Sequence, residues 1–232
     1  MNKITVKKAF IATLPVMAGY IVLGMGFGIL LSSKGYSFWW AALMSVFIYA
    51  GSMQFVGVNL LAGGASILST ALMTLMVNAR HMVYGLSMIE SYRDMGWRKF
   101  FVIFGLSDET YSLVCTEPEL PEGVDRRNYF FLITIMDQIY WLLGSVVGGL
   151  LGNVLPFNTT GIDFSMTALF VCIVVEQWEK KRNHLPAVLG FAVSLACLLV
   201  FGPDRFLIPS MAGISLGLFL FRNQIERGGE RV

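Results

Sequence analysis

Long apolar runs separated by short polar stretches dominate the chain. Most of these runs approach the ~20 residues that an α-helix needs to cross the ~30 Å hydrocarbon core of a bilayer. The seven strongest runs are Phe10–Ser33, Phe38–Leu61, Ile67–Glu90, Tyr129–Leu155, Phe164–Trp178, Leu185–Phe201 and Phe206–Phe221. A weaker run at Phe100–Cys115 is an eighth candidate. The pattern predicts an all-α, polytopic membrane protein with six to eight transmembrane or re-entrant helical segments, forming a single domain over residues 1–232.

Composition supports the same class. Of the 232 residues, 56% are apolar and only 14% are charged, far from the average of soluble proteins. The net charge is +2 and no helix carries a basic stripe, which argues against nucleic-acid binding. The three cysteines are odd in number and two of them lie in apolar runs, so they favour neither disulfides nor a zinc site. We therefore expect no cofactor and no metal.

The positions of the lysines and arginines predict the orientation in the membrane. Positive residues near helix ends mark the cytoplasmic side, and they gather at the N-terminus, at 180–182 and after Phe221. Both termini are therefore expected in the cytoplasm. The loop that contains Arg93 and Arg98 should be cytoplasmic too, yet a plain count of crossings places it outside. Either Ile67–Glu90 and Phe100–Cys115 both cross the membrane, or both dip in and return.

Small residues recur at helical spacing in two runs. Gly144, Gly148 and Gly152 follow one another at intervals of four, as do Gly213 and Gly217. Such steps let the backbones of membrane helices approach closely. The spacing predicts a tightly packed helical bundle.

A polar cluster interrupts the third run near its middle. Placing a charge at the centre of a bilayer costs ~2.5 kcal/mol or more, so we expect Arg80 to have a structural or functional role. A guanidinium could bind a carboxylate through two parallel donors, or it could pair with an acid for stability alone. Arg80 shares a helical face with Tyr84, whereas Asn78 and His81 face elsewhere. His81 could carry protons or be a satisfied core histidine.

Acidic and amide side chains interrupt three other segments. Asp108 could neutralise Arg80, although Asp108 and the adjacent Glu109 could equally lie in a surface loop. Asp137 shares a helical face with Trp141 and could define a cation site, or it could be solvated near a helix end. Small residues around Gln54 suggest a broken helix of the kind that transporters use near the midplane, with plain helix packing as the alternative.

Together these polar motifs resemble the AzlC family, the large subunits of two-component branched-chain amino-acid exporters. The resemblance implies export of branched-chain or similar hydrophobic amino acids across a prokaryotic plasma membrane, together with a small AzlD-type partner subunit. It is carried by Tyr49–Phe55, Gly63–Ala65, Asn78–Gly85, Asp108–Tyr111, Asp137–Trp141, the glycines Gly144 and Gly148, and Gly161–Phe164.

The leading hypothesis is a secondary transporter and not an enzyme. The sequence has no Walker motif, which favours a proton gradient as the driving force. An intramembrane enzyme using His81 with Asp108 or Glu109 is one alternative, and a non-transporting assembly subunit is another. For the transporter we predict substrate contacts at Gln54, Asn78, Arg80, Tyr84, Asp137 and Trp141, and proton coupling at His81, Asp108 and Glu109.

Overall fold

A computed structural model of the chain describes residues 2–115, 120, 123–154, 164, 167–168, 171, 174–175, 178–179, 184–202 and 206–221. The chain divides into two compact units, Met1–Met166 and Thr167–Val232. Each unit is described by itself. The predicted run Phe164–Trp178 lies largely outside the described residues.

Helices are the regular elements of the described residues, which contain no strand. This confirms the predicted fold class. The helices of the first unit are α1 (Lys3–Ser33), α2 (Phe38–Phe47), α3 (Gly51–Ala62), α4 (Ile67–Ser87), α5 (Arg98–Phe104), α6 (Asp108–Cys115) and α7 (Arg126–Val154), and those of the second are α9 (Leu185–Phe201) and α10 (Leu207–Leu220). Among the described residues, α1 and α7 are the helices that are both long and apolar enough to cross a membrane.

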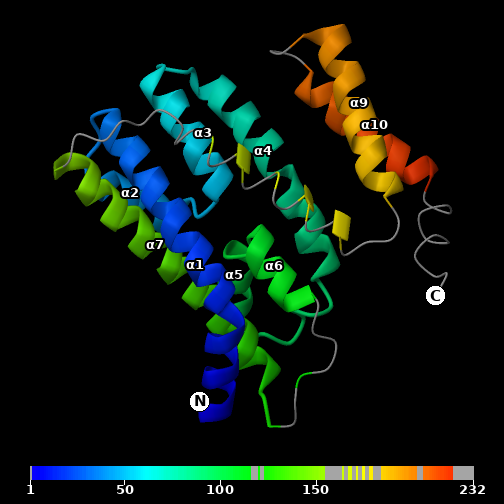
Figure 1. The fold of residues 1–232 in the computed structure, drawn as a ribbon. Helices are drawn as coiled ribbons and strands as arrows, with labels where there is room; N and C mark the ends of the chain where they lie inside the picture. The colour runs from blue at the N-terminus through cyan, green and yellow to red at the C-terminus, as the bar shows by residue number, and fades with distance from the viewer. Residues whose placement is uncertain are drawn as a thin grey trace. The chain divides into compact units, whose positions relative to one another are not determined.

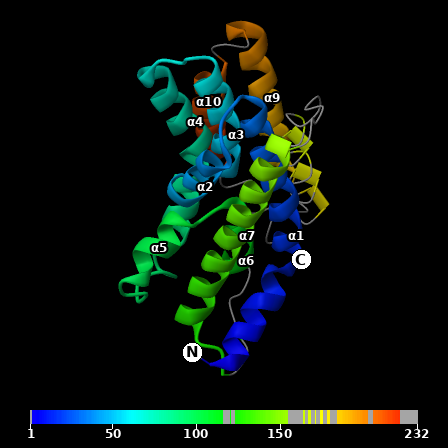
Figure 2. The same cartoon turned by 90° about the vertical axis from the view of Figure 1, so that its left-hand side faces the viewer.

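The helices α1 and α7 lie side by side and run in the same direction (Figures 1 and 2). Glycines on both helices form the contact: Gly24 faces Gly144, and Gly28 faces Gly148. A Cβ atom on Gly28 would overlap the backbone of Ser145 in the facing helix. Van der Waals contact between close backbones replaces the hydrophobic force that is absent between helices in lipid. The predicted close packing at these glycines is confirmed.

A hairpin of two short helices replaces the single helix predicted at Phe38–Leu61. The chain runs along α7 from Phe38, which packs against Gly149, to Val46, whose carbonyl accepts a hydrogen bond of 3.3 Å from Gln138 Nε2. It then turns at 48–50 and returns as α3. With 10 and 12 residues, α2 and α3 are each about 15–18 Å long, roughly half of a bilayer core. The break that the small residues around Gln54 suggest is therefore present, but the chain reverses there, so Phe38–Leu61 does not cross as one helix.

The next two segments follow neither of the two predicted alternatives. The helix α4 is continuous over 21 residues, about 31 Å, which is long enough to cross. The run Phe100–Cys115 is instead a second hairpin, in which α5 and α6 are separated by a turn at 105–107. The helix α4 is thus unbroken, whereas the run Phe100–Cys115 turns back toward the side from which it starts. Gly105 directly follows α5 and Ser107 directly precedes α6.

Positive side chains gather at the end of this unit where α1 and α7 begin. Hydrogen bonds tie the neighbouring segments together there, from Asn2 to the Gly123 carbonyl at 2.9 Å and from Arg126 to Ser91 at 3.2 Å. At the opposite end of the described unit, Lys34 is the one basic residue. The first end carries Lys3, Lys7, Lys8, Arg93, Arg98, Lys99, Arg126 and Arg127.

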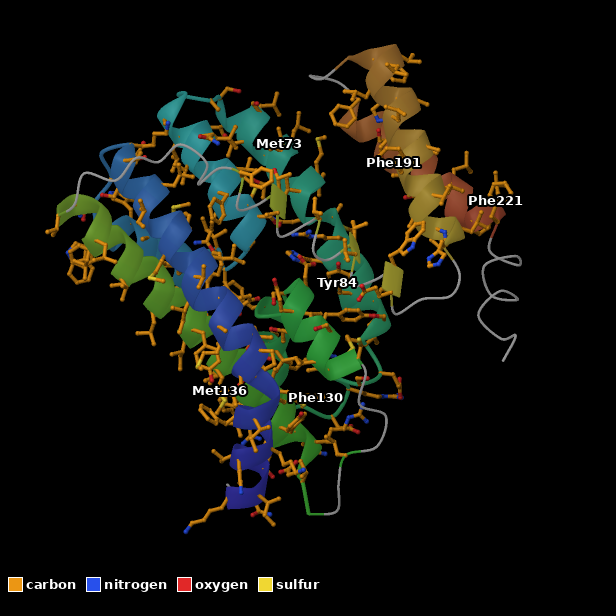
Figure 3. The ribbon with its side chains drawn as sticks, viewed as in Figure 1. Met73, Tyr84, Phe130, Met136, Phe191 and Phe221 are labelled. Atoms are coloured by element: carbon orange, nitrogen blue, oxygen red, sulfur yellow. The ribbon has the colours of Figure 1, made fainter. Side chains whose placement is uncertain are left out.

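The second unit contains a pair of apolar helices, α9 and α10, that pack against each other. Phe191 of α9 and Phe221, directly after α10, are marked in Figure 3. A Cβ atom on Gly213 would come within 2.9 Å of Val193, and one on Gly217 would come equally close to Leu189. These two glycines therefore keep the helices close, as their spacing predicts.

We expect Gly28→Ala to lower the free energy of unfolding by about 1–3 kcal/mol, because the added methyl group overlaps the α7 backbone. Gly19→Ala on the same helix is the matched control, since nothing lies within 4 Å of its Cβ position. Thermal unfolding of the purified protein in detergent measures both. Equal melting temperatures for the two variants would contradict the proposed tight contact between α1 and α7.

Candidate functional site

The turns of the two hairpins approach each other beside the middle of α7. The ring of Tyr49, in the first turn, lies 6.4 Å from the ring of Phe104 at the end of α5. Gly105 of the second turn packs against Thr134 of α7, where a Cβ atom would overlap the threonine methyl group. Tyr49 has a φ of +43°, and among the described residues it is the one non-glycine with positive φ. The helices α3 and α6 both begin here, so the positive ends of two helix dipoles lie in the same region.

Arg80 of α4 connects both hairpins. Its Nη2 atom donates a 2.6 Å hydrogen bond to the hydroxyl of Ser52, in the first turn of α3. The same nitrogen lies 3.0 Å from Oδ2 of Asp108, the first residue of α6. The Arg80 and Asp108 side chains are 27% and 18% exposed, so the ion pair is largely removed from solvent. The predicted neutralisation of Arg80 by Asp108 is confirmed.

The other polar residues of the α4 motif differ in how they are placed. Tyr84 stacks on Tyr111 of α6 with ring centroids 4.6 Å apart, and Figure 3 marks Tyr84 where α4 meets α6. His81 is partly buried and its ring lies 6.0 Å from that of Tyr84. The Oδ1 atom of Asn78 is buried and has no hydrogen-bond partner among the described residues. The motif therefore combines a charged pair, an aromatic wall and a buried amide.

Gln54 and Trp141 are joined to each other. The indole Nε1 of Trp141 donates to Gln54 Oε1 at 2.9 Å, and Gln54 Nε2 donates to the hydroxyl of Ser45 at 3.3 Å. Gln54 is fully buried and Trp141 is 4% exposed. In this structure the two side chains thus hold the first hairpin against α7.

A chain of hydrogen bonds joins two carboxyl groups from different helices. Asp137 of α7 is fully buried and accepts a bond of 2.7 Å from the hydroxyl of Thr110. The Thr110 hydroxyl lies 3.1 Å from that of Ser107, which lies 2.6 Å from the hydroxyl of Tyr20 on α1. Tyr20 donates to Glu109 Oε2 at 2.7 Å. Burial of Asp137 excludes the alternative that it is solvated at a helix end.

The predicted site residues thus fall into three groups. Arg80 and Asp108 pair directly, with Asn78, His81 and Tyr84 on the same helix as Arg80, whereas Gln54 bonds to Trp141. Asp137 and Glu109 are linked through hydroxyl groups. Five polar residues of these groups were not predicted as site residues: Tyr20, Ser45, Ser52, Ser107 and Thr110. Tyr20 and Ser45 carry no local signal, because each is a single polar residue in an apolar helix, but Ser52, Ser107 and Thr110 directly adjoin polar motifs.

Metal binding finds no support in this region. Within the ranges that the structure describes, no three His, Cys, Asp or Glu side chains are grouped so that they could hold a metal ion.

Comparison with known proteins identifies the family. The model of the AzlC protein family matches residues 15–155, which include the hairpins, α4 and all of α7. The chain belongs to the AzlC family. The match covers every residue of the three groups described above, so the polar contacts lie within the AzlC region itself.

Individual relatives of the AzlC family agree with this assignment. The chain is 41% identical over 221 residues to "Branched-chain amino acid transport protein AzlC" of Bacillus subtilis, covering 95% of this chain and 87% of the relative. It is 39% identical to an "Uncharacterized membrane protein" of Helicobacter pylori, with 95% and 96% covered. It is 26% identical to "Inner membrane protein YgaZ" of Escherichia coli, with 74% and 72% covered. No solved structure matches the chain. The chain is therefore an integral membrane protein of a family with a named transport protein.

The Arg80–Asp108 pair yields a prediction about stability. We expect Arg80→Gln and Asp108→Asn each to lower the free energy of unfolding by on the order of 2 kcal/mol, because each removes the 3.0 Å ion pair and leaves the other, partly buried charge without this partner. The double variant should cost less than the sum of the two. Thermal unfolding in detergent measures this difference.

The exposed pair Arg93–Glu90 provides the control. Its side chains are 72% and 81% exposed, so Arg93→Gln should change the melting temperature little. Strictly additive effects of the Arg80 and Asp108 substitutions would show that the two side chains do not interact in the folded protein.

Proposed function

We propose that this chain is a secondary transporter that exports branched-chain or similar hydrophobic amino acids. The observation that carries the proposal is the Arg80–Asp108 ion pair, which lies where the two hairpins meet within an AzlC-family membrane protein. The substrate class follows the printed name of the Bacillus subtilis relative at 41% identity. Transport fits the family better than intramembrane catalysis does.

A zwitterionic amino acid can replace the ion pair without leaving a charge unpaired. Its carboxylate would take the place of Asp108 on the Arg80 guanidinium, which suits a bidentate contact. Its ammonium group would take the place of Arg80 on Asp108. Because both protein charges remain matched, insertion avoids much of the cost of opening a partly buried pair. A solute with only one of the two charged groups would leave either Arg80 or Asp108 unmatched.

The surroundings of the pair suit an apolar amino acid. Tyr84 and Tyr111 form a stacked aromatic wall beside Arg80 and Asp108. Asn78, the predicted substrate contact two positions before Arg80, has a buried Oδ1 atom without a partner among the described residues, but it lies on another face of α4. The first turns of α3 and α6 add helix N-termini, which favour a carboxylate. Gln54 and Trp141 would reach the substrate only in a conformation that opens the first hairpin, because they bond to each other in this structure.

The partner and the driving force are further parts of the proposal. The family resemblance implies a small AzlD-type membrane subunit, and partly buried titratable groups support a proton gradient as the energy source. Glu109 and His81 are both partly buried and next in sequence to the members of the ion pair, so protonation of either would change the field at Asp108 or Arg80.

The charge distribution supports an orientation in a plasma membrane. If the end of the first unit that carries Lys3, Arg98 and Arg127 is cytoplasmic, the positive-inside rule is satisfied along the described part of that unit. The hairpin of α2 and α3 then enters from outside and the hairpin of α5 and α6 from the cytoplasm. The loop with Arg93, which a plain count of crossings places outside, is cytoplasmic in this arrangement.

Efflux of labelled leucine from loaded proteoliposomes tests the function. We expect the protein, together with an AzlD-type subunit, to release leucine faster under an imposed pH gradient. Arg80→Ala should reduce this efflux by about tenfold or more, because the carboxylate loses a charged bidentate partner. Arg93→Ala, which removes an exposed arginine in the turn that follows α4, is the matched control.

Two results would contradict the proposal. Folded wild-type protein with its subunit that moves no branched-chain amino acid would exclude the substrate class. Full efflux by folded Arg80→Ala protein would exclude the carboxylate site.

Cysteine labelling tests the orientation. In a variant whose native cysteines Cys115, Cys172 and Cys197 are replaced by serine, we expect Lys34→Cys to react with an impermeant maleimide in intact cells. Asp94→Cys should react only after the membrane is permeabilised, because both positions are exposed but lie at opposite ends of the unit. The reverse pattern would invert the proposed topology.

A further inference from the structure

A line of three hydroxyl groups between two carboxyl groups is the most unusual polar feature of the first unit. It runs from Glu109 through Tyr20, Ser107 and Thr110 to Asp137, with successive oxygen–oxygen distances of 2.7, 2.6, 3.1 and 2.7 Å. Three separate helices and one turn contribute to it. Packing alone does not require four consecutive hydrogen bonds that begin and end on acids, three of them at 2.6–2.7 Å.

We infer that this line is a proton wire, which transfers a proton between Glu109 and the sealed carboxyl group of Asp137. The inference rests on the proposed function, since it supplies the coupling step of a proton-driven exporter. It gives Asp137 a proton-storing role in place of the substrate contact that the sequence suggests.

Each hydroxyl group in the line can both donate and accept, so the whole line can reverse its direction. In one state protonated Glu109 donates to Tyr20, Tyr20 to Ser107, Ser107 to Thr110, and Thr110 to the Asp137 carboxylate. When every hydroxyl passes its proton forward, the O–H bond of Glu109 breaks and one forms on Asp137. One proton and one negative charge have then exchanged places, and all three hydroxyl groups are neutral again.

The backbone around Ser107 permits both directions. Its hydroxyl oxygen accepts from the Thr110 amide at 3.1 Å, which uses one of its two lone pairs. The second lone pair accepts from Tyr20 in one direction and from the Thr110 hydroxyl in the other, while the single proton goes to the opposite neighbour. Ser107 thus never exceeds its hydrogen-bonding capacity.

The two ends of the line differ in access. Glu109 is partly exposed, whereas Asp137 and Thr110 are fully buried. A proton can therefore reach Asp137 along the hydroxyl groups without water entering the contact of α6 with α7. The nearby titratable groups are Tyr49 in the first turn, Tyr84 of α4, and Asp108, which is paired with Arg80. Breaking the Arg80–Asp108 pair would change the charge beside Glu109, and this links substrate binding to protonation.

Thr110→Val removes one hydroxyl group from the wire and keeps a side chain of similar size. Thr134→Val is the matched control: Thr134 is also fully buried, but its hydroxyl bonds only to the Phe130 carbonyl of its own helix among the described contacts. Tyr20→Phe breaks the same wire from α1 and serves if Thr110→Val does not fold. Two activities are measured in proteoliposomes: exchange of labelled for unlabelled leucine without a gradient, and uphill leucine movement driven by a pH gradient.

We expect Thr110→Val and Tyr20→Phe to keep leucine exchange within about twofold and to lose gradient-driven movement by about a hundredfold or more, the scale of a lost proton-transfer group. Thr134→Val should retain both activities, and Thr110→Ser should recover both. Gradient-driven movement at the wild-type rate in folded Thr110→Val and Tyr20→Phe would overturn the wire. Equal loss of exchange and gradient-driven movement would also overturn it, since the hydroxyl groups would then serve a general step of transport.

An infrared measurement separates this inference from the proposed function. If the wild-type protein exchanges no leucine, the substrate assignment fails, but protonation of Asp137 can still be followed after a pH jump as the carboxyl band that Asp137→Asn removes. Slower appearance of this band in Thr110→Val than in Thr134→Val supports the wire. Equal rates in the two variants overturn it.

Discussion

Direct backbone contact between α1 and α7 is the interaction on which the rest of Met1–Met166 depends. Lipid offers no hydrophobic drive between helices, so close packing and polar contacts must hold them together. Both hairpins pack on α7 in turn, the first through Gly149 and Trp141 and the second through Thr134 and Asp137. The glycines that bring α1 to α7 thereby also place Tyr20 within hydrogen-bond distance of the second hairpin.

Helix breaks inside a membrane protein require that freed backbone groups find partners. The structure meets this need differently in the two hairpins. Ser107 accepts from the amide of Thr110 and so caps α6. The helix α3 has no side-chain cap, but the Ser52 hydroxyl in its first turn accepts from Arg80. Polar residues of the candidate site therefore also stabilise the two helix breaks. This explains why the candidate site lies at the turns of the hairpins.

The sequence predicts the helical class, the long helices and the Arg80–Asp108 pair because apolar length and isolated charges are local signals. It leaves the two hairpins only as alternatives, a broken helix around Gln54 and a re-entrant Phe100–Cys115, because a hydropathy pattern measures apolar length but not chain direction. At the first turn, Ile48–Ala50, the adjoining Gly51 and Ser52 indicate a break, but only tertiary packing reveals that the chain reverses there. The sequence also does not predict Tyr20 as a site residue. A single tyrosine in an apolar helix gives no local signal, and its partners Ser107 and Glu109 are almost ninety positions away. The roles of the site residues in transport stay predictions.

The left-handed backbone of Tyr49 has a mechanical consequence. This conformation costs a bulky residue about 1–2 kcal/mol, so contacts of the Tyr49 side chain must stabilise it. That side chain is 6% exposed and meets Phe104 at the tip of the other hairpin. Tyr49 also packs in a buried cluster with Tyr20 of α1 and Trp141 of α7. The strained turn is therefore braced from two sides, so withdrawal of the second hairpin would expose one face of Tyr49 while α1 and α7 continue to hold the chain reversal in place.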